Sequence, residues 1–150
     1  MKRRLRQRIQ ARSSSVTWVD PPLPLPPGVD EATALRLVSS VSVDGAPPAE
    51  LEGYWREAFG RFLRTWDLAR DLRGTALELG ANPYFLTVLM HEFSPFDLTL
   101  ANYFGPRPDA TTTQHVTFES VRGGRQTLSL SSHLFDAERD VFPFETDSFD

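Results

Sequence analysis

The chain has 150 residues, 40% of them hydrophobic, which is enough for one domain of ordinary size with its own core. It has no cysteine, which excludes disulfides, thiolate metal sites and a cysteine nucleophile. The formal net charge is −4, but residues 1–12 carry six of the 16 basic side chains and no acidic one. The rest of the chain is therefore strongly acidic, which argues against nucleic acid as a partner.

Residues 1–28 are predicted to be a basic and proline-rich tail. The tract of residues 1–12 lacks the apolar core of a secretory signal, and no apolar run is long enough to span a membrane, so the expected location is the cytoplasm. A basic tract can contact RNA or a membrane surface, but a solvated terminus is the simpler interpretation. The prolines of residues 21–27 favour an extended strap, with a polyproline ligand as the alternative.

Residues 29–74 are predicted to be a helical extension. Residues 30–43 can form a helix capped by Asp30, although their β-branched end leaves its conformation open. Residues 47–72 form the stronger helix, because a Pro-Pro pair suits its first turn and Gly74 follows its end. Packing on a sheet is the expected role of its apolar stripe, and a substrate-pocket wall is the alternative. The stripe comprises Leu51, Tyr54, Trp55, Ala58, Phe59, Phe62, Trp66 and Ala69.

A strand, a glycine turn and a helix follow in direct succession. Residues 76–79 are an apolar run with the length of a buried strand, and Gly80 breaks it where a tight turn is needed. Pro83 lies where a helix can begin, and residues 84–93 are apolar enough to pack on a sheet. Such a unit opens nucleotide-binding α/β domains, because it places free backbone N–H groups and a helix N-terminus at the carboxyl end of the strand.

A second parallel strand is predicted at residues 98–101, followed by a loop at residues 105–113. Two alternating runs, residues 115–121 and 126–131, then flank a Gly-Gly pair, which is a hairpin signal. The pair Gly123-Gly124 could instead bind phosphate, but no helix follows it. The three histidines lie far apart without metal-ligand spacing: His91, His115 and His133.

The strand–turn–helix unit and the second strand, together with the end of the chain, resemble the cofactor-binding half of class I S-adenosyl-L-methionine-dependent methyltransferases. Glu78-Leu79-Gly80 resembles their first motif, although the later glycines are missing. Residues 135–150 resemble the segment after their third strand, where Asp-Ala, Pro-Phe, an acidic turn and Ser-Phe-Asp lead into strand four. The resemblance covers residues 74–150. It implies an α/β fold with a Rossmann-like three-layer parallel sheet, a hairpin insertion, and a cofactor-binding half at residues 75–150 that is truncated after the third strand.

The resemblance also implies where S-adenosyl-L-methionine is held. Glu78 and Gly80, with Ala81 and Asn82 of the same loop, would lie at its methionine end. Asn102 would hold the ribose hydroxyls, although the family has an acidic residue there. An asparagine can accept one hydrogen bond and donate another, so this contact would be weaker.

The adenine is assigned in the same way. Tyr103 would pack on its face, and Asp136 would accept a hydrogen bond from its amino group. The backbone of Ala137 would face the ring edge. Glu138 is a second candidate for the role of Asp136, because Arg139 looks inserted relative to the family pattern.

The implied reaction is transfer of a sulfonium methyl group to a small-molecule or glycan acceptor, with donor and acceptor held in line. No catalytic residue can be named, because the acceptor-binding half is expected beyond Asp150; His133 is a candidate base that is more simply structural. Two alternatives stay open. One is a nucleotide- or NAD-binding oxidoreductase with the same strand–turn–helix unit, and the other is a non-catalytic α/β interaction module.

Overall fold

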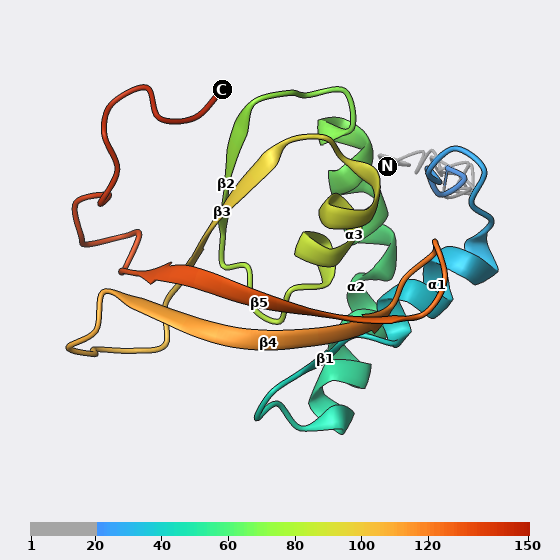
Figure 1. Ribbon diagram of the computed structural model, residues 1–150, viewed down its shortest axis with the longest axis horizontal. Coiled ribbons are helices and arrows are strands. Elements are labelled where there is room, and N and C mark those ends of the chain that lie inside the picture. The colour runs from blue at the N-terminus through green and yellow to red at the C-terminus, as the bar shows by residue number, and fades with distance from the viewer. Residues whose placement is uncertain (1–20) are drawn as a thin grey trace, which may run out of the picture.

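The computed structural model describes residues 21–150, so the basic tract and the first part of the predicted tail lie outside the described residues. The described chain is an α/β structure of three helices and five strands (Figure 1). None of its helices has the length and apolar character needed to cross a membrane. The helical extension and the following residues share one hydrophobic core.

The first helix, α1, spans Glu31–Ser39 and starts as predicted. The Asp30 side chain accepts a hydrogen bond from the Thr33 N–H at 2.8 Å, which confirms it as the N-cap. The β-branched end left open by the sequence is not helical, because Ser42–Val43 form a short strand, β1. Strand formation there agrees with the preference of β-branched residues for extended backbone.

The long helix α2 spans Pro48–Ala69, with Pro47 at its N-cap. The predicted stripe is confirmed in most of its length, since five of its eight side chains are buried: Leu51, Ala58, Phe59, Phe62 and Trp66. Leu63, which the predicted stripe did not include, is buried as well. Tyr54 departs from the stripe, because 42% of its surface stays exposed. The stripe therefore packs into the core along most of α2 and leaves one aromatic ring at a surface pocket.

Two glycines inside α2 differ in their surroundings, and this predicts different responses to alanine. A Cβ at Gly53 would meet no atom within 4 Å, whereas one at Gly60 would lie 3.0 Å from the Arg64 guanidinium and 3.3 Å from a Leu23 methyl group. We expect Gly53→Ala to raise the free energy of unfolding by about 0.5–1 kcal/mol, because alanine loses less backbone entropy in a helix. Gly60→Ala should gain less or destabilise. Urea unfolding measures both variants, and equal gains would contradict the close packing at Gly60.

The five strands form one mixed sheet in the order β1-β4-β5-β3-β2. The strands β2 (Thr75–Leu79), β3 (Asp97–Asn102) and β5 (Arg125–Leu134) run parallel, as expected for the first three strands. β4 (Thr111–Glu119) is antiparallel to β5. The sheet is therefore mixed instead of purely parallel, because a strand, and not the helix that the family resemblance implies, connects β3 to β5. The predicted hairpin insertion is confirmed.

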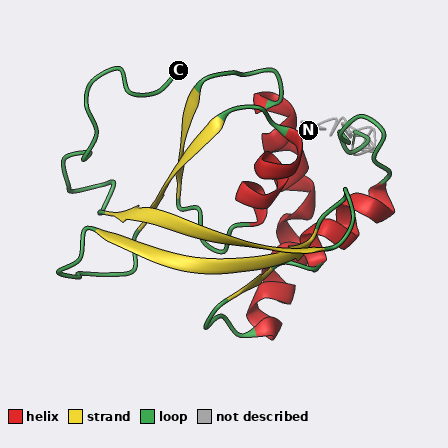
Figure 2. Ribbon diagram, viewed as in Figure 1, coloured by secondary structure: helices red, strands yellow, loops and turns green. Residues whose placement is uncertain are grey.

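The three helices lie on one face of the sheet (Figure 2). The strand residues that face them join the core: Leu98, Leu100, Val116, Phe118, Leu128 and Leu130. The other face of β4 and β5 exposes short polar side chains: Thr111, Thr113, His115, Thr127, Ser129 and Ser131. Residues 21–150 thus form two layers instead of the predicted three, because no helix among them covers this polar face.

The third helix, α3, spans Phe85–Phe93 and begins later than predicted. Pro83 is not its first residue, since Tyr84 precedes the helix in the left-handed conformation with φ of 71°. A residue in this conformation cannot belong to a right-handed helix. The Tyr84 side chain is fully buried, and its contacts explain why the backbone turns there.

Residues 135–150 contain no helix or strand, are mostly exposed, and contact the sheet at His133 and Thr75. Phe144 contacts both His133 and Phe149 edge-on, with ring centroids 4.9 and 5.1 Å apart. The Asp150 N–H donates to the Thr75 carbonyl at 3.0 Å, and the Thr75 N–H donates to the Asp150 carboxylate at 2.8 Å. Asp150 therefore lies along β2, at the end of the strand order, as Figure 1 shows.

Candidate functional site

The predicted site residues gather at one edge of the sheet. Since β2, β3 and β5 are parallel, their carboxyl ends meet at this edge. Glu78 lies at the end of β2, Asn102 ends β3, and Asp136 follows β5. Ligands of open α/β sheets bind outside the carboxyl ends of the strands. Two pockets and a buried polar cluster occupy this region.

A buried cluster of five polar residues ties the loop after β2 to the neighbouring strands. The Asn102 side-chain oxygen accepts from the Asn82 N–H at 2.8 Å, and its amide group donates to the Tyr84 and Ser132 hydroxyls at 3.1 and 2.9 Å. The Tyr84 hydroxyl donates to the Gln114 side-chain oxygen at 2.8 Å. We call these residues the Asn102 cluster. It fixes the loop conformation, because each buried polar group finds a partner.

The Asn102 cluster bears on the predicted ribose contact. Asn102 is only 4% exposed, and both its oxygen and its amide nitrogen are engaged within the protein. In this conformation it has no free group to offer a ribose. The sequence reasoning missed the cluster partners Tyr84, Gln114 and Ser132, which come from three separate segments. No local pattern marks them, and only the sheet order brings them together.

The loop's backbone donors are also engaged, which corrects the expectation that they are free. The N–H groups of Gly80 and Ala81 both donate to the Ala101 carbonyl, at 2.8 and 3.3 Å. The Tyr84 N–H donates to the Ala81 carbonyl at 2.6 Å. The loop folds back on the end of β3, so it does not present these groups to a phosphate or carboxylate as a glycine-rich loop does.

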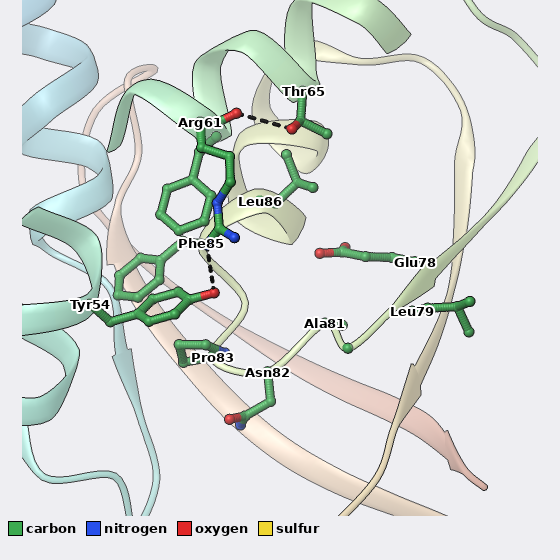
Figure 3. Close-up of a pocket in the computed structure, with 12 residues that line it drawn as sticks. Tyr54, Arg61, Thr65, Glu78, Leu79, Ala81, Asn82, Pro83, Phe85 and Leu86 are labelled. Carbon is green, nitrogen blue, oxygen red and sulfur yellow. Dashed lines mark hydrogen bonds between the residues drawn. The ribbon is translucent and has the colours of Figure 1, made fainter. Parts of the chain in front are cut away.

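The first pocket, here the β2 pocket, lies between α2 and the loop after β2 and has a volume of about 190 Å³ (Figure 3). The predicted residues Glu78, Gly80, Ala81 and Asn82 all line it. The opposite wall comes from four residues of α2: Tyr54, Arg61, Phe62 and Thr65. A pocket wall was the alternative role of the stripe that includes Tyr54 and Phe62, whereas no sequence pattern marked Arg61 or Thr65. Tyr54 and Arg61 are seven residues apart, a helical spacing that places both on one face.

The β2 pocket holds one acidic and one basic side chain. Burial raises the pKa of Glu78 to about 7, and the hydrogen bond that its carboxylate accepts from the Thr87 hydroxyl at 2.7 Å opposes this rise. The Arg61 guanidinium donates to the Tyr54 hydroxyl at 2.9 Å and lies 5.6 Å from the Tyr54 ring centre. Neither side chain forms an ion pair with another described residue. The positive charge of Arg61 is therefore available to a ligand, and so is the negative charge of Glu78 where the pH leaves its carboxylate ionised.

The second pocket, here the β5 pocket, lies beyond the ends of β3 and β5 and has a volume of about 280 Å³. Tyr103, which is 52% exposed, and Asp136 line it together with Arg107, Arg139 and Asp140. Two residues predicted from separate motifs for one adenine ring therefore share a cavity.

Asp136 also organises its own turn. One carboxylate oxygen accepts the Glu138 N–H at 3.0 Å, and the other lies 3.8 Å from the Arg139 guanidinium. Ala137 and Glu138 are exposed and do not line the β5 pocket, so the geometry favours Asp136 over Glu138. His133 lines neither pocket at this edge and packs edge-on against Phe144.

The described residues contain no group of three or more histidine or acidic side chains arranged to hold a metal ion. Comparisons of the chain with protein families, with curated proteins and with solved structures give no match.

Proposed function

We propose that this domain binds S-adenosyl-L-methionine and serves the transfer of its methyl group to a small-molecule or glycan acceptor. The observation that carries the proposal is the shared position of Tyr103 and Asp136 in the β5 pocket. An aromatic ring offers a stacking surface to adenine, and a carboxylate accepts hydrogen bonds from the adenine amino group. The Glu138 N–H, which donates to one oxygen of Asp136 at 3.0 Å, keeps this carboxylate oriented.

The β2 pocket suits the other end of this cofactor. The Arg61 guanidinium in this pocket can pair with the α-carboxylate of the methionine part of the cofactor. Ionised Glu78 can pair with the ammonium group of the same part. Each pocket alone is smaller than the roughly 300–1,000 Å³ typical of ligand sites. The ends of β2 and β5 are two strand spacings, roughly 10 Å, apart, so one elongated ligand can use both pockets.

The arrangement of the parallel strands supports a Rossmann-like fold. In chain order the first, second and third parallel strands are β2, β3 and β5, and they lie side by side in that order. Rossmann-like sheets have the order 3-2-1-4, in which the fourth strand lies beside the first. Asp150 is hydrogen bonded to Thr75 at that position beside β2.

In this proposal the protein positions the reactants. The bound cofactor supplies an activated methyl group on its positively charged sulfur. Tyr103 and Asp136 set the orientation of the base, while Arg61 and Glu78 fix the amino-acid end. Holding both ends defines where the sulfur between them lies, which is the main contribution that positioning makes to such a transfer. Asn102 acts as a support for the loop instead of a ribose ligand.

Calorimetric titration with S-adenosylhomocysteine tests the proposal, with NAD as the control ligand. We expect saturable binding of S-adenosylhomocysteine alone. Asp136→Asn should weaken it about tenfold, because the variant loses a charged acceptor while its remaining oxygen can still hold the Glu138 N–H. Asp97→Asn, at the exposed opposite end of β3, is the matched control and should bind as the natural chain does.

The engaged Asn102 favours one second candidate, a non-catalytic α/β interaction module. The same titration separates the two. A chain that unfolds cooperatively on heating but does not bind S-adenosylhomocysteine would contradict the cofactor proposal and support the module. Binding of NAD in its place would support the nucleotide-dependent oxidoreductase.

A further inference from the structure

A third cavity lies at the end of the sheet away from the two cofactor pockets. It is formed where the turn between β4 and β5 meets α1 (Figure 1), has a volume of about 270 Å³, and is here called the hairpin pocket. Arg36 from α1 and Arg125 from β5 line it, together with Glu119, Ser120 and the Gly123-Gly124 turn. Because Arg125 begins β5 and Asp136 follows its end, this pocket is separate from the proposed cofactor site.

The two arginines of the hairpin pocket make none of the direct side-chain contacts that the other arginines of residues 21–150 make. The described residues include ten arginines, and eight of them form a hydrogen bond, an ion pair or a contact with an aromatic ring: 56, 61, 64, 70, 73, 107, 122 and 139. Arg36 and Arg125 form none of these within residues 21–150. Arg125 lies opposite Glu119 in the β4–β5 pairing, yet the two form no ion pair.

Arg36 is not needed to cap α1 either. The Ser40 N–H bonds to the carbonyls of Arg36 and Leu37, and the Ser39 and Ser40 hydroxyls donate to the same two carbonyls. These bonds satisfy the carbonyl groups that a basic side chain often caps. Hydrogen bonds within the first turn lower the pKa of Asp30 at the start of α1, and the charge of Arg36 adds to this effect. The Arg36 guanidinium forms no hydrogen bond or ion pair within residues 21–150, so it can still pair with a ligand.

The turn that completes the hairpin pocket is held in place by Glu92 of α3. The buried Glu92 carboxylate accepts hydrogen bonds from the Ser120 hydroxyl and the Val121 N–H at 2.9 and 3.0 Å. Both turn glycines have positive φ, and a Cβ on either would meet no atom within 4 Å, so the space beside them is open. The Gly124 N–H donates to no group among the described residues.

We propose that the hairpin pocket binds the phosphoryl group of a small phosphorylated ligand. Two guanidinium groups outweigh the single Glu119 carboxylate, and guanidinium pairs well with phosphate through two parallel hydrogen bonds. The turn that lines the pocket also carries the Gly124 N–H, which donates to no group within residues 21–150. The remainder of the body is strongly acidic, so free arginines on two elements that share one cavity mark a local site for an anion. The proposal is independent of the proposed function.

Titration of inorganic pyrophosphate into the ¹⁵N-labelled chain tests this site by NMR. We expect saturable shifts confined to the amides of Gly123 and Gly124 and their neighbours, with a dissociation constant of about 1 mM, as a few charged hydrogen bonds provide. Arg36→Gln and Arg125→Gln should each weaken binding about fivefold or more, and Glu119→Gln should strengthen it, because the opposing charge is removed. Each variant must show the cooperative thermal transition of the natural chain.

The matched control is Arg73→Gln, an exposed arginine outside the hairpin pocket. Unchanged binding in this variant supports a defined site. Equal weakening by Arg73→Gln, shifts spread over the surface, or no shifts at all would overturn the proposal. S-adenosylhomocysteine binding should be the same in the arginine variants of the hairpin pocket, which keeps this test separate from that of the cofactor site.

Discussion

Asn102→Ala is expected to lower the free energy of unfolding by about 3 kcal/mol, because it leaves several buried polar groups without partners. The Asn82 N–H loses its only acceptor in the Asn102 cluster, and the Tyr84 and Ser132 hydroxyls lose a donor. Tyr84 and Ser132 have no exposed surface, so water cannot replace these bonds. Urea unfolding followed by tryptophan fluorescence measures the loss.

Two further variants make this prediction specific. Asn82→Ala removes an amide whose contact with Gln114 is long, at 3.4 Å, and should cost less than about 1 kcal/mol. Asn102→Asp retains an acceptor for the Asn82 N–H, so it should cost less than Asn102→Ala. If Asn102 is a support for the loop, its carboxylate variant should not increase the affinity for S-adenosylhomocysteine. A clear increase would show that this side chain reaches the ribose.

Local sequence signals were sufficient for most elements of the fold. The Pro-Pro pair and Gly74 bracketed α2 to within a few residues, and the Gly-Gly pair identified the β4–β5 hairpin. These signals work because glycine and proline restrict or extend the backbone conformation at single positions. The start of α3 was misplaced because the residue that turns the backbone there is neither a glycine nor a proline. Tyr84 has no sequence mark for a left-handed conformation, which its buried hydrogen bonds impose.

The sheet order was beyond local signals. Alternating residues predicted that 115–121 and 126–131 pair with each other, but not that β5 also pairs with β3. The second pairing depends on contacts far apart in the chain, such as that of Asn102 with Ser132. It places β4 in the connection where a helix was expected and leaves one polar sheet face without a helix.

The candidate site was predictable only where motifs lie at strand ends. Tyr103 and Asp136 were assigned from separate segments and line one pocket, since parallel strands bring their ends together. Arg61 was missed, because its place opposite Glu78 depends on how α2 packs across the loop. The free loop donors were predicted wrongly, since a strand–turn–helix pattern does not show that the Ala101 carbonyl accepts them.

Glu78→Gln is expected to make the protein more stable at pH 8 and to change its stability little at pH 4. Burial raises the pKa of Glu78 from its ordinary value of 4.5 to about 7, so the folded state binds its proton more tightly than the unfolded state. The stability that this proton contributes is complete below pH 4.5 and is lost as the pH rises through about 7. The loss amounts to at most about 3 kcal/mol, from the free energy equivalent of the pKa shift.

Glutamine is neutral at every pH and can still accept the hydrogen bond from the Thr87 hydroxyl, so the variant isolates the ionisation of Glu78. Urea unfolding of both proteins between pH 4 and 8 should therefore give curves that separate as the pH rises, with the variant above. Glu57→Gln, on the exposed side of α2, controls for the loss of one negative charge and should follow the natural protein. Parallel curves for Glu78→Gln would contradict the buried carboxyl.

If the methionine ammonium pairs with Glu78, cofactor binding at pH 7 should favour the ionised carboxylate and release a proton from the natural protein but not from the variant. Calorimetry in buffers of different ionisation enthalpy measures the number of protons released. A release in the natural protein alone would show that the ionisation of Glu78 is coupled to cofactor binding.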